Sequence, residues 1–217
     1  MERFSSTSLA RPIWVPHGSA ARGVARIDKC ARNEKETTVE SKGASYNAVA
    51  KTLHWLILAL LIAQFIFAWT MPHIGRNTPV TTLISLHFTF GVIIIIVAIV
   101  RLVWRLTHVE PPPEDGIPPW QTASARLVHW LLYILLFVVP ILGWINASYR
   151  GMPIVMFGLE LPKLIATRAP GWGWSGDLHV LLADYAVLGL VGLHVAAALY
   201  HYFVRRDGVL QRMLPGG

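Results

Sequence analysis

The chain ends in a long apolar run, from Trp174 to Val204, that carries three histidines. About 20 apolar residues are enough for a helix to span a bilayer, and this run exceeds that length. His179, His194 and His201 lie in it, although ionisable groups are costly inside a membrane and are usually functional there. His179 and His194 are 15 positions apart, which in a helix is a rise of roughly 22 Å and an offset of roughly 60°. One helix therefore presents two imidazoles at opposite depths of the bilayer.

Three further apolar runs precede this one, so the sequence predicts an all-α integral membrane protein, a bundle of four transmembrane helices. The expected spans cover about residues 48–71, 83–106, 125–147 and 176–204. Of the residues, 54% are hydrophobic and 14% are charged, whereas soluble domains carry about 25% charged residues. The single cysteine, Cys30, excludes an internal disulfide and a multi-thiolate metal centre within one chain. Metal chemistry in this chain would therefore rest on histidine.

Residues 1–45 form a polar, basic segment without apolar periodicity. The segment lacks the hydrophobic stretch of a signal peptide, and its low hydrophobicity with excess charge predicts a disordered tail. A transit peptide is the alternative interpretation, and four acidic residues weigh against it: Asp28, Glu34, Glu36 and Glu40. We expect residues 46–217 to form the membrane domain.

Lysine and arginine are distributed unevenly between the two sides of the predicted bundle. Fifteen lie in the tail and first helix start, around the second connection, or after the last span, and four lie in the first and third connections. Because cytoplasmic segments are enriched in lysine and arginine, both termini are predicted to be cytoplasmic. This placement explains the net charge of +7 without a nucleic-acid partner. The predicted partner is membrane lipid.

The predicted topology fixes the depth of each histidine. His54 begins an outward helix and lies near the cytoplasmic face, and His194 lies on the same side in an inward helix. His87 and His179 each begin an inward helix and lie near the outer face. The predicted pairs are therefore His87 with His179 and His54 with His194. Two neutral imidazoles from different helices can fill both axial positions of a haem iron in a bundle core, so the pattern indicates two haems.

Several of these residues admit a second interpretation. A single histidine at a helix end is commonly an interfacial residue, whereas four at two matching depths favour ligation. His129 shares the depth of His54 and either replaces it as partner of His194 or contacts a haem propionate. His201 either donates a hydrogen bond and a proton to a quinone headgroup or is interfacial. Asp184 falls off the histidine face of a regular helix, and either pairs with a neighbouring helix or is protonated.

Several motifs in combination resemble the bacterial cytochrome b561 family. They are LHW in the first span, SLHFTFG in the second, FGLELP in the third connection and GLHVAAALYHYF followed by RDGxLxRMLP at the end. The resemblance covers about residues 46–215 and is greatest to the short four-helix di-haem, superoxide oxidase-like type. The second connection, EPPPEDGIPPW, departs from the family pattern because it is acidic and contains no lysine.

The resemblance implies an oxidoreductase of the bacterial inner membrane. Such a protein takes electrons from superoxide at the periplasmic side and passes them through two haem b groups to ubiquinone near the cytoplasmic side. Arg76 and Arg150 match basic positions of the family on the outer side, with Lys163 and Arg168 nearby, and a positive mouth attracts an anion such as superoxide. The other residues implied are His54, His87, His179 and His194 as iron ligands and His201 at the quinone end.

Two other functions fit the same histidine pattern. Cytochrome b subunits of hydrogenases and formate dehydrogenases resemble it and dock a periplasmic iron–sulfur partner in place of superoxide, although they commonly have further helices or longer loops. A small transporter or channel could use the histidines as a proton relay without haem. Stable purification with a redox partner protein would favour the first alternative, and a colourless purified protein would favour the second.

Overall fold

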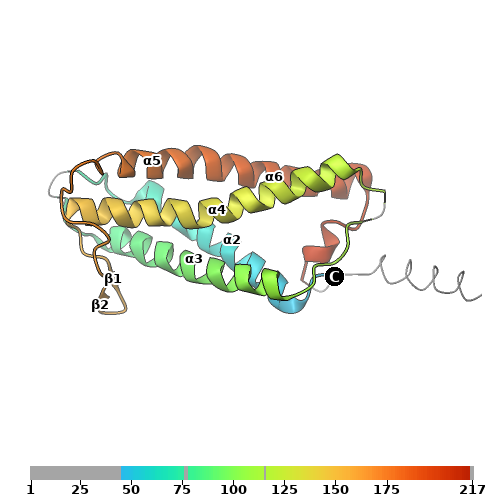
Figure 1. Cartoon of the computed structure of the whole chain (residues 1–217), viewed down its shortest axis with the longest axis horizontal. Coiled ribbons are helices and arrows are strands. Elements are labelled where there is room, and N and C mark those ends of the chain that lie inside the picture. The colour runs from blue at the N-terminus through green and yellow to red at the C-terminus, as the bar shows by residue number, and fades with distance from the viewer. Residues whose placement is uncertain (1–44, 76–77, 115, 216–217) are drawn as a thin grey trace, which may run out of the picture. The chain divides into compact units, whose positions relative to one another are not determined.

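The computed structural model describes residues 45–75, 78–114 and 116–215, so the predicted basic tail lies almost entirely outside it. Within these residues, four helical segments are long and apolar enough to cross a membrane, which confirms the predicted class (Figure 1). They are α2 (Ala48–Thr70), α3 (Thr82–Thr107), α4 (Pro119–Arg150) and a fourth segment, Ser175–Arg205.

The helix boundaries follow from local capping. The side chain of Asn47 accepts a hydrogen bond from the Ala50 N–H at 2.8 Å, and the Thr81 hydroxyl accepts one from the Ile84 N–H at 3.4 Å. Such caps satisfy N–H groups that have no partner within the first helical turn. The third helix, α4, is longer than the predicted 125–147, because Pro119 is well placed at a first helical position and the helix ends in the left-handed Gly151.

The fourth segment is not the regular α-helix that the sequence predicted. It consists of α5 (Ser175–Leu181), the π-helix η1 (Leu182–Val187), α6 (Leu188–Tyr200) and the π-helix η2 (His201–Arg205). A π-helical turn accommodates more residues than an α-helical turn and rotates everything beyond it. The histidines on either side of η1 therefore have a different angular relation from the one calculated for a continuous α-helix.

The helices pack in sequence along the chain. The backbone of α2 packs along α3, α3 packs along α4, and α4 packs against α5, η1 and α6. Figure 1 shows α3, α4 and the fourth segment side by side in this order. Among the described residues, neither α2 nor α3 makes comparable backbone contact with α5 or α6. The fourth segment is therefore held mainly by α4. Between the backbone of this segment and those of α2 and α3 lies a space lined by side chains.

The connection after α4 contains a short antiparallel hairpin, β1 (Val155–Met156) with β2 (Leu159–Glu160). Its two turn residues, Phe157 and Gly158, both have positive φ, at 51° and 84°, as a tight hairpin turn of this length requires. We call the end of the bundle with residues 71–75, 78–81 and 151–174 the loop end. The end with residues 45–47, 108–114, 116–118 and 206–215 is the termini end. A small buried core at the loop end consists of Ile84, Ala147, Met152 and Ile154.

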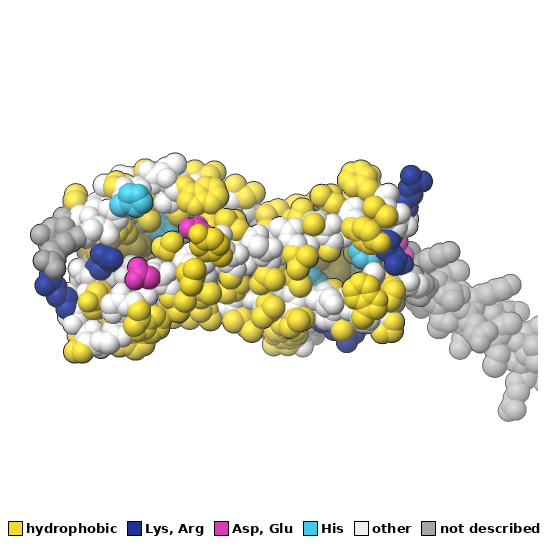
Figure 2. Space-filling view, turned by 90° about the horizontal axis from the view of Figure 1, so that it is seen from above, with side chains coloured by type: hydrophobic (Ala, Val, Ile, Leu, Met, Phe, Trp, Pro, Cys, Tyr) yellow, Lys and Arg dark blue, Asp and Glu magenta, His cyan; other side chains and the backbone are white. Residues whose placement is uncertain are grey.

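Large hydrophobic side chains cover the outside of the bundle. Ile62, Ile96 and Leu193, from three different helices, are 54%, 49% and 55% exposed. In the face drawn in Figure 2, hydrophobic side chains cover the middle and Lys and Arg side chains lie near the ends. An apolar surface of this extent is a liability in water and the expected surface of a helix bundle in lipid. The protein is therefore embedded in a membrane and contacts lipid.

Candidate functional site

At the loop end, two imidazoles from different helices face each other. His87 of α3 is 8% exposed, and its ring centroid lies 6.0 Å from that of His179 of α5, with the ring planes at 88°. These are the two histidines that the sequence assigned to one depth. The structure brings them together.

The helix α4 holds the ring of His179 in place. The Nδ1–H of His179 donates a hydrogen bond to the Val139 carbonyl oxygen at 2.8 Å, which leaves Nε2 directed elsewhere as an available ligand. This is the arrangement that orients metal-binding imidazoles in proteins. Gly143 provides the space for the ring, because a Cβ atom at that position would lie only 2.9 Å from His179 Cε1.

Unpaired polar atoms gather around His87. Its Nδ1 and the Oε1 of Gln64 are buried and, among the described residues, have no hydrogen-bond partner. The amide nitrogen of Gln64 donates to the His87 carbonyl oxygen at 3.1 Å and lies 3.4 Å from His87 Nε2. A buried polar atom without a partner costs about 1–3 kcal/mol, so these atoms indicate a site built for a group that interacts with them.

At the termini end, three imidazoles come together. The rings of His54 on α2 and His194 on α6 have centroids 6.1 Å apart and planes at 61°. His129 of α4 lies closer to His194, at 5.3 Å. The Nδ1 of His54 is buried without a partner among the described residues. The structure thus brings together the second predicted pair, with His129 beside it.

The spacing within the two pairs fits ligation of one iron by two histidines. An imidazole nitrogen lies about 2 Å from a metal that it binds, so two rings on opposite sides of one iron have centroids roughly 6 Å apart. The distances of 6.0 Å for His87–His179 and 6.1 Å for His54–His194 match this value, whereas the 5.3 Å of His129–His194 is shorter. The described residues contain no group of three or more ligating side chains for a bare metal ion. His87 with His179, and His54 with His194, are the residues that would hold an iron-containing ring between them.

The surroundings of both pairs leave room for a flat ring. Each pair joins the fourth segment to a helix with which its backbone does not pack closely, α3 at the loop end and α2 at the termini end. The face drawn in Figure 2 has two hollows in which histidine atoms are visible, one nearer each end. On α6, Cβ atoms added at Gly189 and Gly192 would meet no described atom within 4 Å. The hollows therefore lie beside histidine side chains, as a flat ring held by them would require.

The chain after η2 folds back across the termini end. The Ser45 hydroxyl and the Tyr46 N–H both donate to the Arg212 carbonyl oxygen, at 3.0 and 3.2 Å. The indole N–H of Trp55 donates to the Met213 carbonyl oxygen at 2.9 Å, and the Arg212 guanidinium forms an ion pair with Glu114. Residues 206–215 are therefore tied to the start of α2 and to the second connection.

His201 has a specific partner at this end. Its Nδ1–H donates to the Asp207 carboxylate at 2.6 Å, and Arg205 Nε donates to the same oxygen at 3.2 Å. Burial raises the pKa of Asp207, but the hydrogen bonds from His201 and the Val209 N–H, with the charges nearby, outweigh it and hold that pKa below its ordinary value. Asp207 is thus an anionic acceptor that fixes the His201 ring.

Replacing Asp207 with asparagine is expected to destabilise the protein by about 1–3 kcal/mol at pH 7. Because the pKa of Asp207 is lowered in the folded state, its contribution is complete above about pH 4 and is lost as the pH falls through the folded value. Thermal unfolding of both proteins should therefore differ at pH 7, and the difference should shrink progressively as the pH falls below about 4. Glu110→Gln is the control, since Glu110 pairs with Arg105 from a more exposed position, 41%, and should change little. A loss of stability that stays the same across the whole pH range would contradict the prediction.

A cavity of about 720 Å³ opens at the start of α2, where Ser45 and Tyr46 line it. Lys51 lines it and is only 8% exposed, and Tyr46 and Trp55 supply aromatic walls. Burial, and then the charge of Glu110, raise the pKa of Tyr46, so this phenol stays a hydrogen-bond donor. His201 is not among the residues that line the cavity.

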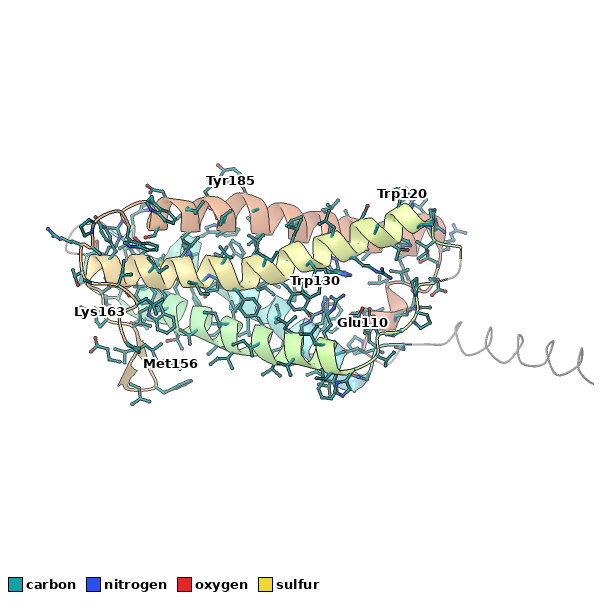
Figure 3. All side chains as sticks on the ribbon, in the orientation of Figure 1. Glu110, Trp120, Trp130, Met156, Lys163 and Tyr185 are labelled. Carbon is teal, nitrogen blue, oxygen red and sulfur yellow. The ribbon has the colours of Figure 1, made fainter. Side chains whose placement is uncertain are left out.

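The basic residues predicted at the outer mouth lie at the loop end where the structure describes them. Arg150 lines a cavity of about 270 Å³ together with Gly75 and Thr78, and its Nε donates to Asn146 Oδ1 at 3.2 Å. Lys163 lies at the same end (Figure 3). Arg168 is in the same connection, in a left-handed conformation with φ 58°. Arg76 lies outside the described residues.

The angular offset of Asp184 from His179 was calculated for a regular α-helix, and the structure does not have a regular α-helix there. Asp184 lies in the π-helix η1, and its charge reaches the ring of His179. The next residue, Tyr185, points away from the bundle and is 74% exposed (Figure 3). Of the two loop-end histidines, the Asp184 charge acts on His179.

Sequence reasoning missed several residues of this site. Gln64, Val139 and Gly143 carry no motif of their own, and their roles arise only when α2 and α4 pack beside the histidines. In the sequence, Arg101 served only as one of the basic residues that predict the orientation in the membrane. In the structure, its charge also acts on the rings of His54, His129 and His194. Its position, 14 residues after the histidine of α3, is the signal that could have identified it.

A helical membrane bundle in which imidazoles from different helices face one another at two depths has the architecture of a membrane b-type cytochrome. This chain belongs to the prokaryotic cytochrome b561 family, which it matches over residues 45–216. The resemblance expected from the motifs is thereby confirmed. Membership implies b-type haem, electron transport and oxidoreductase chemistry in a membrane.

Three relatives extend this finding. A probable superoxide oxidase, CybB, of Yersinia pestis is 29% identical over 173 residues, which are 78% of this chain and 96% of that protein. Cytochrome b561 homolog 2 of Escherichia coli K12 is 29% identical over 176 residues, 78% of this chain and 90% of the relative. Cytochrome b562 of Cereibacter sphaeroides is 30% identical over 174 residues, 78% of this chain and 94% of the relative.

Proposed function

We propose that the protein is a di-haem membrane oxidoreductase that carries electrons from superoxide to ubiquinone. The observation that carries the proposal is the pair of matched spacings, 6.0 Å for His87–His179 and 6.1 Å for His54–His194. The name of the Yersinia relative, a probable superoxide oxidase, supports the choice of electron donor. The proposed iron ligands are His54, His87, His179 and His194.

The side chains around each pair suit this role. Bound haem b would supply reversible one-electron chemistry at two depths of the membrane. The hydrogen bond from His179 to Val139 keeps Nε2 free for the iron and raises its basicity. Gln64 holds the backbone of His87.

We assign the termini end to the cytoplasm and the loop end to the periplasm. The support is the excess of lysine and arginine in the segments at the termini end. With this orientation, two superoxide anions each give up one electron at the loop end and leave as dioxygen. One ubiquinone takes up two electrons and two protons at the termini end and becomes ubiquinol. Negative charge then moves inward and the protons come from inside, so the reaction contributes to the membrane potential.

The termini end offers the groups that quinone reduction needs. The cavity of about 720 Å³ beside Tyr46, Lys51 and Trp55 is within the range of about 300–1,000 Å³ typical of small-molecule sites. His201, hydrogen-bonded to Asp207, lies at the same end and has the residue type suited to transfer protons near neutral pH. We propose that the cavity binds the quinone headgroup and that His201 delivers protons from the cytoplasm.

The test is a reconstituted system with purified holoprotein in liposomes that contain ubiquinone. Superoxide generated outside should produce ubiquinol, with one ubiquinol formed for every two superoxide anions consumed. Vesicles without the protein, and vesicles supplied with superoxide dismutase, are the controls. A protein that contains haem but forms no ubiquinol from superoxide would refute the proposed donor or acceptor and leave the haem assignment intact.

The hairpin at the loop end favours one alternative function. Phe157 and Leu159 at its tip are 84% and 72% exposed, and a docked redox protein could cover them. The protein would then be the cytochrome b subunit of a hydrogenase-type or formate dehydrogenase-type complex. Co-purification of a stoichiometric iron–sulfur protein from native membranes, lost in Phe157→Ser, would support this alternative over superoxide.

Replacing Arg150 with glutamine is expected to slow ubiquinol formation from superoxide roughly threefold at low ionic strength. The guanidinium attracts the anion to the loop end, and salt screens this attraction over about 10 Å at 0.1 M. The two proteins should therefore converge at high salt when initial rates are compared. Arg206→Gln, which removes an exposed charge at the opposite end, is the control and should keep the wild-type salt dependence. A rate ratio independent of salt would contradict the steering role of Arg150.

A further inference from the structure

The two histidine pairs have electrostatically different surroundings. At the termini end, the charge of Arg101 acts on His54, His129 and His194, and that of Arg105 acts on His129. At the loop end, the charged group that acts on the pair from within the described residues is the carboxyl of Asp184. One pair therefore sits near arginine and the other near a carboxyl.

The position of Arg101 follows from the geometry of α3. It lies 14 residues after His87, a rise of roughly 21 Å, and within about 40° of the same helix face. The helix thus turns an imidazole toward the loop-end pair and a guanidinium toward the other pair. In the described part of the chain no carboxylate pairs with Arg101, so its charge is not neutralised there.

Aromatic rings connect the two arginines to the histidine cluster. The guanidinium carbon of Arg101 lies 5.7 Å from the ring centre of Tyr133, and that of Arg105 lies 5.5 Å from it. Tyr133 is buried and follows His129 by one helical turn of α4, on the same face. Trp130 lies between α4 and α3 in Figure 3, and its ring centre is 5.6 Å from the guanidinium carbon of Arg105. These rings hold the cationic groups in the half of the bundle that contains the termini-end pair.

We propose that Arg101 raises the reduction potential of the termini-end haem above that of the loop-end haem, and thereby directs electrons from the loop end to the termini end. The proposal rests on the di-haem assignment. Reduction adds one negative charge to a haem, and a fixed positive charge nearby stabilises the reduced form. The interaction is stronger in the low-dielectric bundle than in water. Because the carboxyl near His179 acts in the opposite sense, the two environments reinforce one gradient.

The test is a spectroelectrochemical titration of purified holoprotein, which contains both haems. Arg101→Gln should lower the midpoint potential of one haem and shift the electron equilibrium between the two haems about tenfold, equivalent to about 59 mV for a one-electron couple. Arg101→Lys, which keeps the charge, should preserve most of the wild-type separation. Arg126→Gln removes an exposed charge from the same end and should change the separation much less.

The affected haem is identified by repeating the substitution in the His179→Ala background, which is expected to retain the termini-end haem alone. The same downward shift there supports the proposal. Unchanged midpoints in Arg101→Gln, an equal shift in Arg126→Gln, or a shift confined to the loop-end haem would overturn it. Loss of the termini-end haem in both Arg101 variants would also overturn it, since the residue would then be an anchor. A wild-type protein without haem would instead refute the di-haem assignment itself.

Discussion

Replacing His179 with alanine is expected to halve the haem content of the purified protein and to abolish superoxide-dependent ubiquinol formation. The loop-end haem would lose one of two axial ligands, and His87, across a distance of 6.0 Å, cannot by itself complete a six-coordinate centre. The termini-end pair comes from different helices, His54 from α2 and His194 from α6, and should keep its haem. Pyridine haemochrome absorbance per protein measures the change, from two haems per chain to one.

His129→Ala is the matched control for this experiment. It removes an imidazole from the bundle interior, but its ring lies 5.3 Å from that of His194, closer than a shared iron requires. We therefore expect both haems to be retained in His129→Ala, whereas His54→Ala should lose one. Two haems per chain in His179→Ala would contradict the pairing at the loop end. Loss of a haem in His129→Ala together with full haem content in His54→Ala would show that His129, and not His54, is the partner of His194.

Replacing Gly143 with alanine is expected to have nearly the same effect as removing the ligand. The added Cβ would lie 2.9 Å from Cε1 and 3.1 Å from Nδ1 of His179, so the ring must move and its hydrogen bond to Val139 must lengthen. Alanine is itself a better helix former than glycine by roughly 1 kcal/mol, so the helix should not weaken. We expect haem content to fall toward one per chain and the rate of ubiquinol formation to fall at least about tenfold, equivalent to about 1.4 kcal/mol.

The control for Gly143→Ala is Gly75→Ala. Gly75 lies at the same end of the bundle, and its added Cβ would make an ordinary contact of 3.6 Å with Thr78. Haem content and rate should stay at their wild-type values in this variant. If Gly143→Ala also retains two haems and full activity, the ring of His179 does not need the position that the structure gives it.

Much of the architecture could be predicted because a membrane helix is specified locally. Each span needs only its own length of apolar residues, and lysine and arginine in the connections are read without any knowledge of packing. The bundle and the family are confirmed. The depth argument also proposed which histidines would meet, and the structure places His87 beside His179 and His54 beside His194. Their role as iron ligands stays a prediction.

The errors arose where backbone geometry departs from a regular helix. The stretch around Asp184 reads as continuous α-helix, since no proline or glycine interrupts residues 177–188. The structure makes it π-helical, where it packs against α4. The angular offset calculated for Asp184 therefore does not apply, because it assumed a regular α-helix. The longer α4, which runs to Arg150, reflects polar helical turns that hydropathy does not detect.

The sequence by itself determined that the chain crosses a membrane four times and that imidazoles occur at two depths, because hydrophobic length and residue order are properties of the chain alone. Only the tertiary structure decided which groups surround those imidazoles: the Val139 carbonyl and the space at Gly143 beside His179, and the guanidinium of Arg101 near His194. These relations join helices that are remote in sequence, and they exist only once side chains pack. The ligand pairs therefore follow from depth, whereas their orientation and electrostatic environment follow from packing.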